Sequence, residues 1–301
     1  MFKIAYYTNY SHPVPENHRF PMAKYELLYE QLLLENIAEK KDFFTPSKAQ
    51  IADICLAHKK EYVESFINLS LSKSEARKIG FTQDKMLIDR ELTLVQGTIQ
   101  GAILAWNGQK IAFNIAGGTH HAYSDRGEAF CMLNDQAVAT MFLLKNTFVK
   151  KILIIDLDVH QGNGTAEIFG NNPKVFTFSM HGKNNYPFEK EKSDLDIPLD
   201  DKTSDNQYLS ILKNILPKLI ETEKPDFIFY QSGVDVLASD KLGRLSLSVE
   251  GCADRDKIVF ELCEKYQIPV QCAMGGGYSP DLVTIIKAHT NTFRVAKDIF
   301  D

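Results

Sequence analysis

The chain has 301 residues, of which 44% are hydrophobic, and its formal net charge is −5. This length supports one large domain or two small ones with a substantial core. The acidic balance and the lack of any long Lys/Arg block argue against a nucleic-acid-binding surface and against polybasic membrane attachment. The first ten residues hold no apolar stretch typical of a signal peptide, and no run of about 18 apolar residues predicts a membrane span.

The five cysteines are scattered and odd in number, and no two of them form a CxxC pair. This pattern argues against a disulfide framework and against a cysteine-type zinc finger, and it is typical of a reducing compartment. We therefore expect a soluble cytoplasmic protein.

Short apolar runs alternate with helical patterns along the whole chain. The runs are nearly continuous rather than alternating, which predicts buried parallel strands covered on both faces. The strands are expected at 3–8, 110–116, 151–159, 174–180, 226–232 and 268–274. The helices are expected at 20–37, 59–69, 84–106, 132–146, 204–222, 250–266 and 280–299. This alternation predicts one α/β domain over residues 1–301.

Ser204 or Asp205 is the expected cap of the helix at 204–222. The polar stretch 181–205 is long for a connection, and long loops in compact domains are usually functional. We expect this loop to shape a substrate entrance.

Polar and ionisable side chains follow four of the predicted strands. Ligand sites of open α/β sheets collect where strands end at their carboxyl edge. The side chains at these ends are His120, His121, Asp156, Asp158, His160, Asp235 and Tyr278. So many polar and ionisable side chains at strand ends are hard to explain unless they form a functional site.

The stretch "IDLDVHQGNG" (155–164) places Asp156, Asp158 and His160 on one face of a predicted strand. Two carboxylates at this spacing repel each other unless a cation lies between them. A structural alternative is an aspartate that caps the next helix beside a hydrogen-bonded histidine. Adding Asp235 favours a metal, because one histidine and two carboxylates leave coordination positions free, as a catalytic site requires.

His120 and His121 are adjacent on a glycine-rich turn, from which both rings can reach one cavity. They are either satisfied polar side chains or general acid/base groups, with Asp156 and Asn163 as partners that orient them. Tyr278 follows three glycines and is either a buried structural tyrosine or a donor to a developing oxyanion. Cys131 is an alternative nucleophile, although a lone cysteine beside Phe130 is more often a small core residue.

The four motifs together resemble those of the histone deacetylase family. "GGTHHAYSDRGEAFCMLND", "IDLDVHQGNGT", "SGVDVLASDKLGRLSLS" and "GGGYS" occur in that family's order, and the resemblance extends from "SHPVPENHRFPMAKYELL" onward. The residues of these motifs are most similar to those of class IV deacetylases and their bacterial relatives. The resemblance implies an arginase-like α/β fold with a central, mostly parallel, eight-stranded sheet.

The resemblance also implies roles for individual residues. Zinc would be bound by Asp158, His160 and Asp235, with Fe(II) as an alternative metal. His120 and His121 match the tandem histidines, Tyr278 the tyrosine that polarises the scissile carbonyl, and Asp156 the carboxylate paired with the first histidine. The walls of an acyl-lysine tunnel would include Phe130, Phe188 and Gly276, and a structural potassium ion would meet backbone oxygens of Asp156, Asp158, His160, Ser179 and Met180.

Two positions depart from parts of the family. Asn163 stands where class I members carry an aspartate, so that the proton affinity of His121 is raised less. Thr119 replaces an aromatic residue frequent before the paired histidines, which we expect to change the packing behind the site and not its chemistry.

The expected reaction is hydrolysis of an acyl-lysine side-chain amide in a protein or peptide by metal-activated water, with acetyl or longer fatty acyl groups as candidates. An acetylpolyamine hydrolase would use the same residues. A binuclear arginase-type enzyme would need further Asp or His metal ligands at these strand ends. A non-catalytic module that binds acyl-lysine would not need the complete set of metal ligands, histidines and tyrosine. A hydrolase that used Cys131 would not need zinc. The sequence does not predict the oligomeric state.

Overall fold

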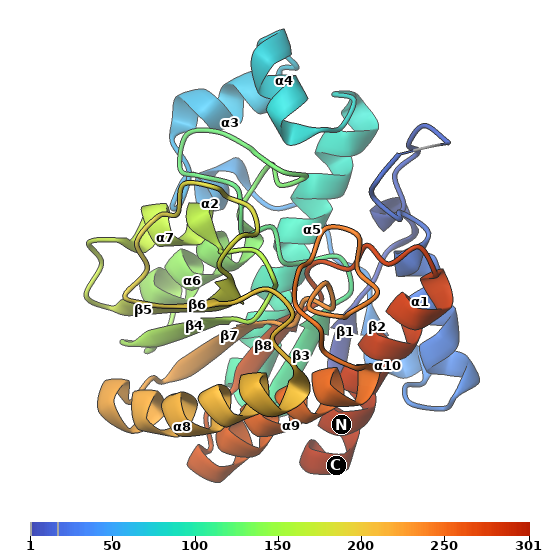
Figure 1. Cartoon of the computed structure of the whole chain (residues 1–301). Helices are drawn as coiled ribbons and strands as arrows, with labels where there is room; N and C mark the ends of the chain where they lie inside the picture. The colour runs from blue at the N-terminus through green and yellow to red at the C-terminus, as the bar shows by residue number, and fades with distance from the viewer. Residues whose placement is uncertain (1, 17) are drawn as a thin grey trace.

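Eight parallel strands form a single sheet in the computed structural model of the chain, which describes residues 2–16 and 18–301. Met1 and Asn17 lie outside the described residues, and Asn17 belongs to the segment 11–28 where the family resemblance begins. The strands are β1 (Lys3–Ala5), β2 (Phe43–Phe44), β3 (Ile111–Asn114), β4 (Ile152–Asp156), β5 (Val175–Gly182), β6 (Leu195–Leu199), β7 (Phe227–Gln231) and β8 (Val270–Ala273). Their order across the sheet is β2–β1–β3–β8–β7–β4–β5–β6 (Figure 1).

Helices cover both faces of the sheet, as Figure 1 shows. Helices α8, α9 and α10 lie along one face, where α10 also packs on α1, and α5 and α6 pack together on the other. The α-helices are α1 (Lys24–Leu34), α2 (Ile51–Ile54), α3 (Lys60–Ile67), α4 (Lys73–Ile79), α5 (Lys85–Leu104), α6 (Asp135–Asn146), α7 (Asn163–Phe169), α8 (Asp205–Glu223), α9 (Val249–Tyr266) and α10 (Leu282–Phe300). Short helical turns of other types are η1 (Thr8–Tyr10), η2 (Lys40–Asp42) and η3 (Ala105–Gln109). Among the described helices, none has both the length and the apolar character needed to cross a bilayer.

The predicted parallel sheet is confirmed, but its strands end earlier than the apolar runs suggested. The run 151–159 becomes a strand only over Ile152–Asp156. The Asp156 carboxylate accepts the N–H of Asp158 (3.1 Å), and the Asp158 carboxylate accepts the N–H of His160 (3.0 Å). These local side-chain bonds compete with the sheet and draw the chain out of the strand. The predicted strand face shared by Asp156, Asp158 and His160 is therefore wrong, because two of the three lie beyond the strand.

The sequence analysis missed two strands and three α-helices, namely β2, β6, α2, α4 and α7, and the short turns η1 and η2. The stretch 181–205 is not wholly a loop, because Leu195–Leu199 pairs with β5 at the sheet edge. This strand alternates the apolar side chains of Leu195, Ile197 and Leu199, and it contains Pro198, which only an edge position tolerates. Helix α4 had a readable signal, since Ser72 and Glu75 form a capping box and Gly80 ends the helix in a left-handed conformation. The predicted cap at Ser204 is confirmed.

A buried arginine fixes the loops that leave β4 and β7. The guanidinium of Arg255, on α9, is fully buried and donates to the carbonyl oxygens of Leu157 (3.2 Å), Gly233 (2.6 Å) and Ser232 (3.2 Å). It also pairs with Asp256 at 2.8 Å. One side chain thus fixes the two loops, after β4 and after β7, that carry the candidate metal ligands.

Replacing Arg255 with Met is expected to lower the free energy of unfolding by about 3–5 kcal/mol, because Asp256 would be left buried without its cation and three carbonyl groups without their donor. Chemical denaturation followed by circular dichroism measures this loss. Lys257→Met, on an exposed turn of the same helix, should change stability by no more than about 0.5 kcal/mol. Equal stability of the two variants would contradict the structural role of Arg255.

Candidate metal centre and active site

Asp158, His160 and Asp235 converge at the carboxyl edge of the sheet. Asp158 and His160 follow β4, and Asp235 follows β7, which is the neighbouring parallel strand. All three are buried, and one donor atom from each lies within 4.8 Å of the others. His160 Nδ1 is 3.1 Å from Asp158 Oδ1 and 3.2 Å from Asp235 Oδ2.

Backbone groups hold the two carboxylates in place. The N–H of Val159 donates to Asp235 Oδ1 at 2.9 Å, which ties the β4 and β7 loops together. The N–H of Gly276, beyond β8, donates to Asp158 Oδ2 at 2.8 Å. The orientation of each carboxylate is therefore set by an element other than its own, which is how supporting hydrogen bonds preorganise metal ligands.

Two glycines leave the space that these carboxylates occupy. A Cβ atom at Gly276 would lie 1.9 Å from Asp235 Oδ2, and one at Gly233 would lie 2.2 Å from Asp158 Oδ2. No side chain fits at either position without displacing a candidate ligand. Gly276, predicted to line the substrate tunnel, lies against the candidate ligands.

The donor set fits a divalent transition metal. Burial and the neighbouring Asp158 charge raise the pKa of Asp235 to about 7, and a cation bound between the two carboxylates would oppose this rise. One imidazole and two carboxylates suit zinc or iron, and three protein ligands leave positions for water and substrate.

The tandem histidines face the same cavity with different partners. Their ring centroids are 4.1 Å apart, His120 Nδ1 lies 2.7 Å from Asp156 Oδ2, and His121 Nδ1 lies 2.6 Å from Asn163 Oδ1. Both pairings are those expected from the sequence.

The two histidines differ in charge because their partners differ. Burial lowers the pKa of His120, but the carboxylates of Asp156 and Asp158 outweigh it and raise the pKa to about 9. Burial and the positive charges of His120 and His160 hold the pKa of His121 well below its usual value. The raised pKa of His120 favours its protonated form, whereas the lowered pKa of His121 favours a neutral imidazole that can accept a proton.

Tyr278 lies across the cavity from these histidines. Its ring centroid is 6.5 Å from that of His160 and 6.2 Å from that of Phe130. Burial and the Asp235 and Asp158 charges hold its pKa well above the usual value, so the phenol stays protonated and can donate a hydrogen bond.

Lys24 is a buried cation behind the site that the sequence analysis missed. Its Nζ donates to the carbonyl of Gly275 at 3.0 Å and lies 5.6 Å from the Tyr278 ring centroid. Burial outweighs the nearby carboxylates and lowers its pKa to about 8. A lysine on the polar side of a helix start gives no sequence signal for burial, so only the fold reveals this support of the Gly275–Tyr278 turn.

A cleft of about 550 Å³ leads from the surface to His121, His160 and Tyr278, and Phe130 lines it. An inner cavity of about 40 Å³ continues behind them, lined by Asp158 and Gly276 among others. Phe188 lines only the outer cleft and is 86% exposed, so it is not a tunnel wall at depth. The aromatic ring beside His121 is that of Tyr186, at 5.0 Å between centroids, which the sequence analysis did not single out.

The structure also bears on the remaining candidates from the sequence. Cys131 is buried, and burial holds the pKa of its thiol well above the usual value, which argues against a thiolate nucleophile. Thr119 bonds to Asp135 Oδ1 (2.7 Å) and packs behind the histidines as expected. The potassium site stays a prediction.

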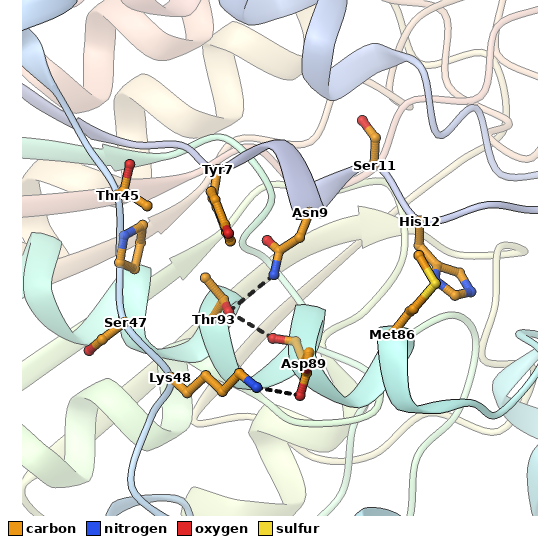
Figure 2. Close-up of a pocket in the computed structure, with 11 residues that line it drawn as sticks. Tyr7, Asn9, Ser11, His12, Thr45, Ser47, Lys48, Met86, Asp89 and Thr93 are labelled. Atoms are coloured by element: carbon orange, nitrogen blue, oxygen red, sulfur yellow. Dashed lines mark hydrogen bonds and ion pairs between the residues drawn. The ribbon is translucent and has the colours of Figure 1, made fainter.

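A second cleft, of about 500 Å³, lies beyond β1 and β2 and contains none of the predicted site residues. Figure 2 shows that four of its polar side chains pair: Lys48 contacts Asp89, and Asn9 donates to Thr93, which is bonded to Asp89 in turn. It presents no cluster of ligand or nucleophile side chains among the residues described.

Comparison with known proteins links most of the chain to one family. The histone deacetylase domain model matches residues 18–293. An uncharacterized protein of Picosynechococcus sp. is 40% identical over 299 residues, which is 99% of each chain. Histone deacetylase 2 of Arabidopsis thaliana is 28% identical and aligns with 89% of this chain and 72% of its own. The crystal structure of the HDA15 HD domain has a similar fold, with a TM-score of 0.84 at 20% identity, covering 99% of this chain and 88% of that one.

Gly276→Ala is expected to weaken zinc binding about 10- to 100-fold, because the new methyl group would displace Asp235 and break the support of Asp158. Zinc titration against a competing chelator measures the affinity. Gly101→Ala, on α5, is the matched control, since its Cβ would make ordinary contacts at 3.5 Å or more. Unchanged zinc affinity in Gly276→Ala would argue against a metal site formed by Asp158, His160 and Asp235.

Proposed function

The chain belongs to the histone deacetylase family, and we propose that it is a zinc-dependent hydrolase that removes acyl groups from lysine side chains. Family membership supports a deacetylase hydrolase function in general. The observation that carries the finer proposal is the convergence of Asp158, His160 and Asp235 beneath a cleft that also exposes His121 and Tyr278.

Asp158, His160 and Asp235 are the residues that would hold the metal, with zinc as the first candidate and Fe(II) as the alternative. When bound, such an ion polarises the acyl carbonyl and lowers the pKa of water to about 7. Asp158 and Asp235 are already oriented by the backbone, so little rearrangement of the chain is required.

We assign His121 as the general base. The Asn163 amide nitrogen donates to the Tyr123 hydroxyl at 3.0 Å, so its oxygen faces His121 and accepts the Nδ1 proton. This leaves His121 Nε2 unprotonated and able to take a proton from the attacking water. The same imidazolium then returns the proton to the lysine amine as it leaves.

His120 and Tyr278 would stabilise the charge that develops on the substrate. Asp156 keeps His120 protonated, which places a fixed cation beside His121. The Tyr278 hydroxyl is a protonated donor across the cavity, suited to the carbonyl oxygen as it becomes an oxyanion.

The class IV likeness of the motifs leads us to propose longer fatty acyl groups as substrates beside acetyl. We also propose a cytoplasmic location. Five free cysteines, four of them buried, support a reducing environment.

Tyr278→Phe should lower kcat by roughly 10²–10³, the usual cost of losing one oxyanion donor, and chelation should abolish activity of the unmodified protein. Release of amine from acetyl-, octanoyl- and myristoyl-lysine peptides measures both effects. Tyr7→Phe, on an exposed tyrosine of the second cleft, should leave kcat unchanged. Failure of the zinc-loaded protein to cleave any of these peptides would refute the proposed function.

Asn163→Asp should move the acidic limb of the kcat/KM profile to higher pH by about 1 to 3 units. A carboxylate beside His121 favours the protonated ring, so the pKa of the base rises and activity is lost at a higher pH as the solution is acidified. The pH dependence of kcat/KM from pH 5 to 9 measures the shift. Asn171→Asp, on an exposed turn, should not move the limb, and an unshifted Asn163→Asp profile would argue against His121 as the base.

A further inference from the structure

Five exposed cations surround the mouth of the active-site cleft, although the chain as a whole is acidic. They come from three separate segments of the sequence: the loop before α1, the end of α4 and the loop after β7. We call this group the basic rim, and it consists of Arg19, Arg77, Lys78, Lys241 and Arg244.

One side of the basic rim is attached to the tunnel wall at Phe130. The N–H of Ala129 donates to the carbonyl of Lys78 at 2.9 Å, and the N–H of Phe130 donates to that of Ile79 at 2.7 Å. The guanidinium carbon of Arg19 lies 5.9 Å from the Phe130 ring centroid. The three cations of this side are therefore held beside the wall along which an acyl-lysine would enter.

The other side is attached to Tyr278 through Asp240. One Asp240 oxygen accepts the N–H groups of Leu242 and Gly243, both at 2.8 Å, and the other accepts the N–H of Tyr278 at 2.6 Å. This carboxylate thus faces inward, and it fixes the loop that carries Lys241 and Arg244 relative to the reacting groups.

Carboxylates compensate only part of the positive charge of the rim, where Glu75 is attracted to Lys78 on α4 but is bound to the N–H of Ser72. Among the described residues that line the cleft, none is an aspartate or a glutamate. Arg244 pairs with Asp201 at 3.3 Å, but the other four cations form no ion pair with a described carboxylate. The nearby Glu128 is occupied by Arg126 (2.9 Å) and the Tyr186 hydroxyl (2.5 Å). Glu189 follows Phe188 in the chain and does not line the cleft.

We propose that the basic rim selects acyl-lysines that are flanked by aspartate or glutamate in the substrate polypeptide. This inference rests on the proposed lysine deacylase function and specifies its substrate class. When an acyl-lysine occupies the cleft, the substrate residues on either side of it lie over the rim, because an extended chain advances about 3.3 Å per residue. Acidic neighbours would be attracted there, whereas basic peptides and acetylated polyamines would be repelled.

The test compares three peptides that share one neutral scaffold and differ only in the two residues on each side of the acyl-lysine, which are Glu, Gln or Lys. Each peptide is made with an acetyl and with an octanoyl group, and N-acetylspermidine is assayed beside them. At 20 mM salt, kcat/KM should favour the Glu peptide over the Lys peptide by roughly tenfold or more. At 500 mM salt, screening should remove most of this preference.

The double charge reversal Lys78→Glu/Lys241→Glu should abolish or invert the preference, measured as the ratio of kcat/KM for the Glu peptide to kcat/KM for the Lys peptide. Lys213→Glu/Lys218→Glu, on the exposed side of α8, makes the same change in net charge away from the cleft and should leave the preference intact. A preference that survives the rim reversal, or that disappears equally in the control, would overturn the role of the rim.

Binding measured by fluorescence anisotropy with the same labelled peptides separates the two levels of the proposal. Cleavage of all three peptides at equal rates, with equal binding, would overturn the acidic preference and leave the deacylase function standing. Tighter binding of the Glu peptide without any cleavage would support the rim and refute the deacylase function. Faster turnover of N-acetylspermidine than of every peptide would overturn the proposed substrate class.

Discussion

The burial of like charges at the carboxyl edge of the sheet is the constraint on which the site depends. Asp156, Asp158 and Asp235 all lie in the interior, where unpaired carboxylates are costly. The chain compensates with cations of its own, His120 against Asp156 and the Arg255 guanidinium beneath the β4 and β7 loops. The His160 ring lies between Asp158 and Asp235, and under the proposed function a metal ion held by all three would compensate the two carboxylates.

The sequence predicted the parallel sheet and the site residues because both leave local signals. Continuous apolar runs mark buried strands, and polar residues at their ends mark the functional edge. The convergence of Asp158 with Asp235 depends on β7 lying beside β4, and no local sequence pattern indicates the order of the strands in the sheet. Lys24 was missed for the same reason, since its burial arises from long-range packing. The edge strand β6 alternates apolar residues but spans only five positions and contains a proline, and the short helix α4 lacked the apolar periodicity by which larger elements are recognised.

Charge is arranged in two layers along the path to the reacting groups. The inner layer is rich in carboxylates and is held by backbone N–H groups, whereas the outer layer is cationic and exposed. Asp240 joins the layers, because it holds both the rim loop and the backbone of Tyr278. Under the proposed function, one carboxylate would therefore connect the surface that recognises the substrate with the backbone that carries the Tyr278 phenol.

The burial of the native thiols makes the protein suitable for site-directed spectroscopy. Cys131, Cys252, Cys263 and Cys272 are buried, and burial raises the pKa of each of these thiols as well as that of the partly exposed Cys55. A maleimide reagent at neutral pH needs an accessible thiolate and would find few competitors for a cysteine introduced at position 241. A fluorophore attached there would report the arrival and departure of substrate polypeptides in real time, without removal of any native cysteine.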